Sequence, residues 1–429
     1  MAMHSDSAVP SVLGSLTADG RLFFLTRFIR LFAYGSLSVV LVFYLVSLGL
    51  TTSQTGLLLT LTLAGDVLVS LFLTTHADRF GRRRMLIVGA VLMAAAGMAF
   101  ASTHNFFFLV VAGTIGVISP SGHEVGPFLS IEQASLSHVI SSQARTEVFA
   151  WYALAGSLAT ALGALCAGAV THALQSGTMA PVNSYRVVVI VYAVFGALLA
   201  LLFFRLTPAT EVRESREDAP RNLKTFFGVG QSHHVVLKLS ALFALDAFGG
   251  GFVVQSFAAY WFYLRFGVNP ATLGAIFFWA NVFAGISALL ASRLASRIGL
   301  VRTMVFTHLP SNVLLILVPL MPTLGMAIAT LLVRFSISQM DVPARQSYTM
   351  AVVPPAERSA AAGITGVART TGAAISPLFA GLLFAQPALI SVPFFIAGGL
   401  KIAYDLSLYK AFVGTRPAEE STLEKPPVR

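Results

Sequence analysis

Charged residues are scarce in this sequence, and their scarcity excludes an ordinary water-soluble protein. Only 11% of the 429 residues are Asp, Glu, Lys or Arg, whereas 56% are hydrophobic. Soluble domains carry about 25% charged residues, so this composition cannot cover a water-facing surface. Lipid must cover much of the chain, and the composition therefore predicts a helical membrane protein.

Cysteine and nucleotide-binding loops are also nearly absent. The one cysteine, Cys166, can form neither an internal disulfide nor a thiolate metal cluster, so we expect no metal or cofactor. No Gly-x4-Gly-Lys-Ser/Thr loop occurs, and any pumping must draw on an ion gradient. The first 20 residues also lack the features of a cleaved signal peptide, so the N-terminus is expected to stay attached and cytoplasmic.

Long apolar runs are what the sequence has in excess. About 20 apolar residues cross the hydrocarbon core, and only a helix satisfies its backbone there. We predict twelve such helices, at about 22–47, 53–75, 84–102, 105–137, 146–173, 185–206, 234–264, 269–292, 301–320, 323–349, 359–385 and 388–411. The polar stretches divide the chain into a cytoplasmic tail (1–21), a six-helix bundle (22–206), a cytoplasmic central loop (207–233), a second six-helix bundle (234–411) and a cytoplasmic tail (412–429).

The basic excess has the pattern of a membrane protein rather than that of a nucleic-acid-binding one. The formal net charge is +10, but no basic run is interleaved with aromatic residues for base stacking. Basic clusters such as 82–84 fall in loops on one side, while the other side holds only Arg186 and Arg265. The positive-inside rule then places both termini in the cytoplasm. Without any organelle signal, we expect a multi-pass protein of the cell inner membrane of a bacterium.

The two halves of the chain resemble each other at an offset of about 213–218 residues. The matched pairs are Gly35 and Gly251, Tyr44 and Tyr260, Gly56 and Gly274, Gln133 and Gln346, Arg145 and Arg358, and Gly168 and Gly381. A parallel repeat of six spans is typical of transporters that bind substrate between their halves, near the membrane midplane.

The end of the second span gives a more specific resemblance. The run Asp78-Arg79-Phe80-Gly81-Arg82-Arg83-Arg84 resembles the loop signature Gly-x-x-x-Asp-Arg-x-Gly-Arg-Lys/Arg of the major facilitator superfamily, with Thr74 in place of its first glycine. A degenerate copy, Ser296-Arg297-Ile298-Gly299, stands where this family has one. The resemblance covers all twelve spans. It implies an all-α membrane protein of two pseudo-symmetric six-helix bundles, a small-molecule substrate and a monomer.

In this family the loop is a conformational latch. By resemblance, Asp78 would contact the N-terminus of span 11, where a helix dipole favours an anion. Arg79 and Gly81 would shape the loop, and Arg82 would pair with an acid of span 4, for which Glu132 is best placed. The alternative is a plain positive-inside loop without a switching role.

Ionisable residues inside spans are costly and usually functional. The resemblance implies that spans 1, 4, 7 and 10 line the cavity. On these spans Arg30 and Asp246 occupy equivalent repeat positions, and so do Glu132 and Arg345. We predict that each pair of opposite charges bridges the two halves and acts as a gate. The alternative is separate residues whose charged ends reach the headgroups.

Span 4 also holds the segment Ser119-Pro-Ser-Gly-His-Glu-Val-Gly-Pro127, whose prolines and glycines predict a kinked or unwound helix. His123 and Glu124 lie there near mid-depth, and either could carry a proton. Asp66 on span 2 is a further proton candidate, or a partner for a neighbouring helix. A bend near the outer face, without a role in coupling, is the alternative for this segment.

Four further side chains are predicted to line the substrate cavity. Arg334 on span 10 could attract an anionic group, and Asp341 lies about two turns away; an ion pair between them is the rival interpretation. Gln255 and Tyr260 on span 7 could also face the cavity. For Tyr260 the alternative is an aromatic belt at the outer interface.

Together these features predict a secondary carrier that works by alternating access, with proton-coupled export (antiport) of an organic solute as the first expectation. Proton-coupled or facilitative uptake of a small polar or anionic metabolite is the second expectation. It stays open because span 5 lacks the proline of the motif that antiporters of this superfamily often carry. A membrane sensor that has kept the carrier fold is the alternative of another class. The His and Ser residues show no nucleophile spacing, so we do not expect an enzyme. Its partners are expected to be a small solute, protons and lipid, but no nucleic acid.

Overall fold

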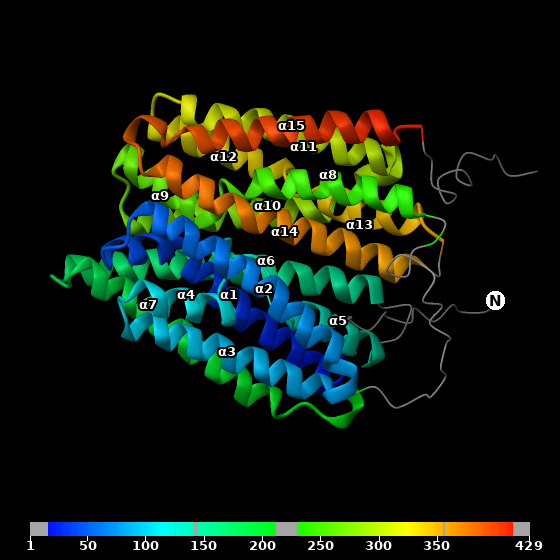
Figure 1. The fold of residues 1–429 in the computed structure, drawn as a ribbon, viewed down its shortest axis with the longest axis horizontal. Coiled ribbons are helices and arrows are strands. Elements are labelled where there is room, and N and C mark those ends of the chain that lie inside the picture. Colours follow the sequence, from blue (N-terminus) through cyan, green and yellow to red (C-terminus); the bar gives the residue numbers. More distant parts are fainter. Residues whose placement is uncertain are drawn as a thin grey trace, which may run out of the picture.

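The computed structural model describes residues 16–124, 126–139, 145–211, 230, 232–354 and 357–414, and each element within them is helical. The long helices lie side by side and end at two opposite faces of the molecule (Figure 1). The helices are α1 (Ala18–Ser47), α2 (Thr52–Phe80), α3 (Arg82–Ser102), α4 (Phe106–Ile115), α5 (Phe128–Val139), α6 (Arg145–Ser176), α7 (Pro181–Phe203), α8 (His233–Gly251), α9 (Gln255–Phe266), α10 (Pro270–Ile298), α11 (Leu300–Leu317), α12 (Leu324–Ile337), α13 (Asp341–Ala351), α14 (Arg358–Phe384) and α15 (Val392–Phe412), with short 3-10 turns η1 (Pro208–Thr210), η2 (Val318–Leu320) and η4 (Pro387–Leu389).

Twelve spans can be followed through these helices, as predicted. Among the described residues, ten segments are long and apolar enough to cross a membrane, and the shorter apolar helices α4 and α12 add two more. Span 4 consists of α4 and α5, span 7 of α8 and α9, and span 10 of α12 and α13. The predicted break in span 4 is confirmed, and span 7 breaks directly after its three glycines. The break in span 10 was not predicted.

Both ends of the described chain lie at one face, which we call the terminal end; the other face is the opposite end (Figure 1). At the terminal end Gly81 joins α2 to α3 with φ 100°, and Gly299 joins α10 to α11 with φ 86°. The two φ values are similar, so the two copies of the family loop make the same kind of turn. Only glycine adopts such positive φ values readily. Gly81 therefore shapes the loop through its backbone conformation, as the family resemblance led us to expect.

The two halves meet at the opposite end through pairs of glycines. A Cβ atom on Gly56 of α2 would lie 2.4 Å from the carbonyl oxygen of Pro377 and 2.8 Å from Cα of Gly381 on α14. A Cβ atom on Gly168 of α6 would lie 2.8 Å from Cα of Gly274 on α10. These four glycines are the residues that the internal repeat matches with one another. The repeat therefore encodes two equivalent backbone contacts between the halves.

The outer surface carries large apolar side chains. Leu68 and Phe107 are each 68% exposed and Leu201 is 64% exposed. Apolar surface of this extent would be costly in water but suits lipid. The exposed side chains therefore agree with a bundle that spans the membrane.

Candidate functional site

Hydrogen bonds tie the two halves together where span 7 is broken. The hydroxyl of Ser256 lies 2.7 Å from the carbonyl oxygen of Ser38 and 2.6 Å from that of Pro120. The side-chain amide of Gln255 donates to the hydroxyl of Ser38 at 2.7 Å. Since Ser38 and Pro120 belong to the N-terminal half, these bonds and the glycine pairs close the opposite end in this conformation.

A cavity of about 140 Å³ lies between the halves, on the terminal-end side of this closure. Its lining is mostly small and polar, with no Phe, Tyr or Trp among the described residues that form it. The lining residues are Arg27, Leu31, His123, Glu124, Ala153, Gly156, Ser157, Thr160, Asn281, Ala284, Ala288 and Gln339. Apolar ligands usually meet aromatic and aliphatic walls, so this lining suits a small polar solute better.

Beside the cavity, the charge of Arg30 is fully buried and bound by two carboxylates of span 4. Nη1 and Nη2 donate to Oε1 and Oε2 of Glu132, each at 2.7 Å, and Nε donates to Oε1 of Glu124 at 2.7 Å. Glu132 is fully buried too, and it also accepts hydrogen bonds from Tyr152 and Thr26. A bidentate pair of this kind is among the strongest in proteins and fixes α1 against α5.

Arg27 connects this network to the cavity. Its Nη1 donates to Oε2 of Glu124 at 2.9 Å, and its guanidinium lies 4.3 Å from the ring centre of Tyr152. Its Nε has no hydrogen-bond partner among the described residues. Gly156 leaves the room for this group, since a Cβ atom there would lie 2.7 Å from Nε. Arg27 thus offers an unused donor next to a carboxylate that is 13% exposed.

The unwound part of span 4 is held by side chains of neighbouring helices. Thr160 donates to the carbonyl of Gly122 at 3.2 Å, and the Asp66 carboxyl accepts a hydrogen bond from the backbone N–H of Gly126. His123 is exposed and lines the cavity. The structure therefore gathers the three predicted proton carriers, Asp66, His123 and Glu124, around one broken segment. Their protonation roles stay predictions.

The C-terminal half has an equivalent buried pair with the charges reversed. Arg345 of α13 donates to Oδ2 of Asp246 on α8 at 3.1 Å. Lys401 of α15 donates to Oδ1 of the same carboxylate at 2.6 Å. Arg345 also lies 3.1 Å from Asp341, one turn earlier on its own helix. In each half, a buried arginine is thus paired with carboxylates of the same half.

The predicted pairs across the cavity do not form in this conformation, and their role as a gate that closes in another conformation stays a prediction. Arg30 is bound by Glu132 and not by Asp246, and Arg345 is bound by Asp246 and not by Glu132. The reason is that span 1 and span 4 adjoin within one half, and so do span 7 and span 10. A buried charge takes the nearest opposite charge because leaving it unpaired is costly.

The predicted pair of Arg82 with Glu132 stays a prediction; in this conformation Glu132 binds Arg30, Tyr152 and Thr26. At the start of α3, Glu211 accepts hydrogen bonds from the backbone N–H groups of Arg82 at 2.7 Å and Arg83 at 3.1 Å. A carboxylate is favourable at a helix N-terminus. The latch role of the loop stays a prediction, because the side chain of Asp78 lies outside the described residues.

None of the four predicted cavity residues is among those that line the cavity described above. Gln255 belongs to the closure, and it is linked to the lining by Asn281, whose amide donates to it at 3.1 Å. Tyr260 is buried and packs edge-on against Phe43, with ring centres 5.5 Å apart. Tyr260 therefore neither lines this cavity nor lies in an aromatic belt at the membrane interface.

On span 10, the rival interpretation of an ion pair between Arg334 and Asp341 is not borne out among the described residues. Asp341 lies beside Arg345 instead, and it is Gln339 that contributes to the cavity lining. The break between α12 and α13 explains the difference, because it turns the residues after 337 away from the helical register assumed for an unbroken span.

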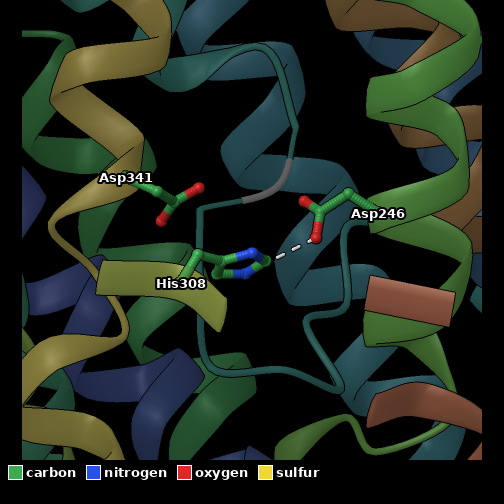
Figure 2. Close-up of side chains that lie close together, drawn as sticks. All are labelled: Asp246, His308 and Asp341. Atoms are coloured by element: carbon green, nitrogen blue, oxygen red, sulfur yellow. Dashed lines mark ion pairs between the residues drawn. The ribbon is translucent and has the colours of Figure 1, made fainter. Parts of the chain in front are cut away.

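Figure 2 shows three side chains whose ligand atoms lie within 4.8 Å of one another, Asp246, His308 and Asp341. Such a group could in principle hold a metal ion. However, the ammonium of Lys401 lies 2.6 Å from Asp246, and Arg345 lies 3.1 Å from both carboxylates. Two cations already occupy the carboxylate oxygens, so the cluster is an ion-pair network and not a metal site.

Sequence reasoning missed several buried ionisable residues. Arg27 lies one turn before Arg30, and His308, Lys401 and Asp405 lie on spans 9 and 12. The signal was present, because each interrupts an apolar run. The sequence does not show, however, that these residues meet the charges of spans 1, 4 and 7, because that depends on which helices adjoin in space.

Comparisons with known proteins agree with this architecture. Residues 23–340 match the family model of the Major Facilitator Superfamily. The chain is 32% identical to the uncharacterized membrane protein YJR124C of Saccharomyces cerevisiae over 423 residues, which cover 92% of this chain and 94% of that protein. It is 32% identical to the quinolone resistance protein NorA of Staphylococcus aureus over 111 residues, which cover 26% of this chain and 29% of NorA. The inward-open xylose transporter XylE from E. coli superposes with a TM-score of 0.71 at 15% identity, covering 94% of this chain and 98% of that one.

Proposed function

Because this chain belongs to the major facilitator superfamily, we propose that it carries a small organic anion across the membrane together with a proton. The observation that carries this proposal is the Arg27–Glu124 pair at the cavity wall. Glu124 is the carboxylate of the buried network that reaches the cavity, and the Nε of Arg27 beside it has no hydrogen-bond partner in the part of the chain that the structure describes. The polar lining without large aromatic side chains supports a small polar solute.

The two residues suggest how solute and proton would be coupled. While Glu124 is ionised, it occupies Nη1 of Arg27. When Glu124 takes up a proton, Arg27 loses its counter-charge, whereas Arg30 keeps both oxygens of Glu132. An anionic group of the solute then replaces Glu124 on Arg27. Proton and anion therefore favour each other's binding, which is the requirement for symport.

We place both termini in the cytoplasm. The terminal end carries the basic run 82–84 and Arg297, whereas the opposite end carries Arg186 and Arg265. This asymmetry supports the positive-inside orientation. In that orientation the structure is closed towards the outside, and its cavity lies on the cytoplasmic side of the closure.

A thermal-shift screen of small mono- and dicarboxylates, followed by proton flux in proteoliposomes, tests the proposal. An inward gradient of the binding anion should drive protons inward. Replacing Arg27 with Gln should weaken anion binding about tenfold to a hundredfold, because a hydrogen bond to a charged group contributes about 1.5–3 kcal/mol. Glu124→Gln should keep anion binding and abolish proton movement. Outward proton movement, or binding unaffected by Arg27→Gln, would contradict the mechanism.

Proton-driven export is the second candidate, and the partial match to NorA favours it. A protein that confers drug resistance can do so by exporting the drug. This candidate predicts that fluoroquinolones stabilise the purified protein and leave the vesicles as protons enter. If fluoroquinolones are moved in exchange for protons and carboxylates are not, the carrier is an exporter and the anion proposal is wrong.

A further inference from the structure

The C-terminal half contributes an amide to the cavity wall, and its neighbours fix the orientation of this amide. Asn281 of α10 lines the cavity and is otherwise buried. Its Nδ2 donates to Oε1 of Gln255 at 3.1 Å and to the carbonyl oxygen of Phe277 at 2.7 Å. An amide nitrogen carries two hydrogens, and these two bonds use both of them. Asn281 therefore offers the cavity its oxygen, Oδ1, to which no residue in the described part of the chain donates.

The hydrogen bonds beyond Gln255 require the same orientation. The hydroxyl of Ser38 donates to the carbonyl oxygen of Gly35 at 2.9 Å, so its oxygen accepts from Nε2 of Gln255 at 2.7 Å. Oε1 of Gln255 then faces Asn281 and needs a donor there. Exchanging the oxygen and nitrogen of Asn281 would set its oxygen against two acceptors, the Gln255 oxygen and the Phe277 carbonyl. The cavity wall at Asn281 is therefore an acceptor.

This acceptor lies close to the unused donor of Arg27. Nε of Arg27 lies against Gly156 of α6, and the next residue, Ser157, lies against α10 at Gly285, where a Cβ atom would be 3.0 Å from Cβ of Ser157. Asn281 precedes Gly285 by four residues, which is one helical turn and about 6 Å along the axis. A short organic acid is long enough to reach from one group to the other.

We propose that the carried anion is a small hydroxycarboxylate, whose carboxylate binds Arg27 and whose hydroxyl donates to Oδ1 of Asn281. This inference rests on the anion-binding role proposed above for Arg27, and it adds that the solute carries a hydrogen-bond donor. A plain carboxylate would cover Oδ1 without donating to it, and a buried acceptor that loses its hydrogen bond is costly. Asn281 is thus the residue that selects the hydroxyl, because a site built to bind a hydroxyl rejects the analogue that lacks it.

The charges of the cavity favour a hydroxyl over an ammonium group as the donor. Among the described residues of the lining, Glu124 is the one carboxylate, and it is protonated in the proposed symport while the anion is bound. An ammonium group of the solute would then lie near Arg27 without a counter-charge, which is costly in a partly buried site. A neutral hydroxyl donates to Oδ1 without this cost.

Isothermal titration calorimetry of the purified carrier with two matched series of acids tests the proposal. Propionate, pyruvate and lactate share three carbons, and succinate, oxaloacetate and malate share four. The keto oxygen of pyruvate or oxaloacetate accepts hydrogen bonds but cannot donate one. In the series that fits the cavity, we expect the better-bound enantiomer of the hydroxy acid to bind about tenfold more tightly than the plain acid, as one net hydrogen bond gives. The keto acid should bind no more tightly than the plain acid.

Two variants connect the preference to Asn281. Asn281→Ala should reduce the affinity for the hydroxy acid to that for the plain acid. Gln255→Ala is the matched control, because it leaves the bond to the Phe277 carbonyl that orients Asn281. It should change both affinities by the same factor and keep their ratio. If Asn281→Ala does not fold, the comparison of the three acids in the parent protein decides the question.

Failure of this inference can be told from failure of the proposed function. If the acids bind and Arg27→Gln weakens them, but the hydroxy acid has no advantage over the plain or the keto acid, the hydroxyl assignment alone is overturned. The same holds if alanine binds more tightly than lactate, or if the preference survives in Asn281→Ala. If none of the six acids binds, the proposed function and this inference are both overturned.

Discussion

Replacing Arg30 with Ala should destabilise the protein by about 3–5 kcal/mol, the range measured when one partner of a buried ion pair is removed. Arg30 donates at 2.7 Å to both oxygens of Glu132 and to Glu124, and neither Arg30 nor Glu132 has exposed surface. After the substitution Glu132 keeps Thr26 and Tyr152 as its donors among the residues of the described ranges. A buried negative charge then stays without a counter-charge.

The measurement is the midpoint of thermal unfolding in detergent, with the yield of monodisperse protein beside it. Arg265→Ala is the matched control, because Arg265 is exposed at the end of α9 and its loss should change stability by at most about 0.5 kcal/mol. The pair Arg30→Met with Glu132→Gln should recover much of the loss, since the amide is neutral: its oxygen accepts from one of the hydroxyls of Tyr152 and Thr26, and its NH2 group donates to the oxygen of the other. Equal unfolding midpoints for Arg30→Ala and Arg265→Ala would contradict the role of Arg30 as the buried counter-charge of Glu132.

Exchanging charges distinguishes pairing within a half from pairing across the cavity. Arg30→Glu combined with Glu132→Arg keeps the charge of the N-terminal half and should restore part of the stability. Arg30→Asp combined with Asp246→Arg should restore no stability. In the N-terminal half it leaves three acids with Arg27 as their cation, and in the C-terminal half it places a further cation beside those already there. If stability recovers in the second exchange but not in the first, this would support the gate between Arg30 and Asp246 that the sequence suggested.

The fold could be predicted in detail because lipid imposes a simple rule on the sequence. Apolar runs gave the twelve spans, and the glycines matched by the repeat, such as Gly56 and Gly274, proved to sit at the contacts between the halves. The break in span 4 was predictable because Pro120 and Pro127 cannot continue a helix without disrupting its hydrogen bonds. These features are local, and each is readable from a short segment.

The partners of the buried charges could not be predicted, because pairing depends on which helices adjoin in space. Arg30 and Glu132 are separated by 102 residues, and Asp246 and Arg345 by 99. Repeat symmetry relates Arg30 to Asp246 as equivalent positions, but equivalent positions lie in different halves and need not touch. Arg334 and Asp341 are absent from the cavity lining for a related reason, since the turn between α12 and α13 changes which side of span 10 faces inward.

The second large effect is expected at the glycine contacts that close the opposite end. Gly381→Val should shift the conformational equilibrium of the carrier away from the conformation described here. A Cβ atom at this position would lie 2.5 Å from the carbonyl oxygen of Thr52 and 2.8 Å from Cα of Gly56. Both are backbone atoms, so no side-chain rotation relieves the overlap, and the halves must separate. Overpacking of this kind costs about 1–3 kcal/mol or more, which is enough to invert a balanced equilibrium.

Spin labels on the two halves can report this separation. His104→Cys and Gln386→Cys place labels on exposed loops at the opposite end, after the native thiol is removed by Cys166→Ser. The distance distribution should move to longer values in Gly381→Val. Gly366→Val is the matched control on the same helix, because a Cβ atom there meets nothing within 4 Å. If both variants give the distribution of the parent, the glycine contact does not set the conformation. If only Gly381→Val lengthens it, close backbone approach is what holds the outer side shut.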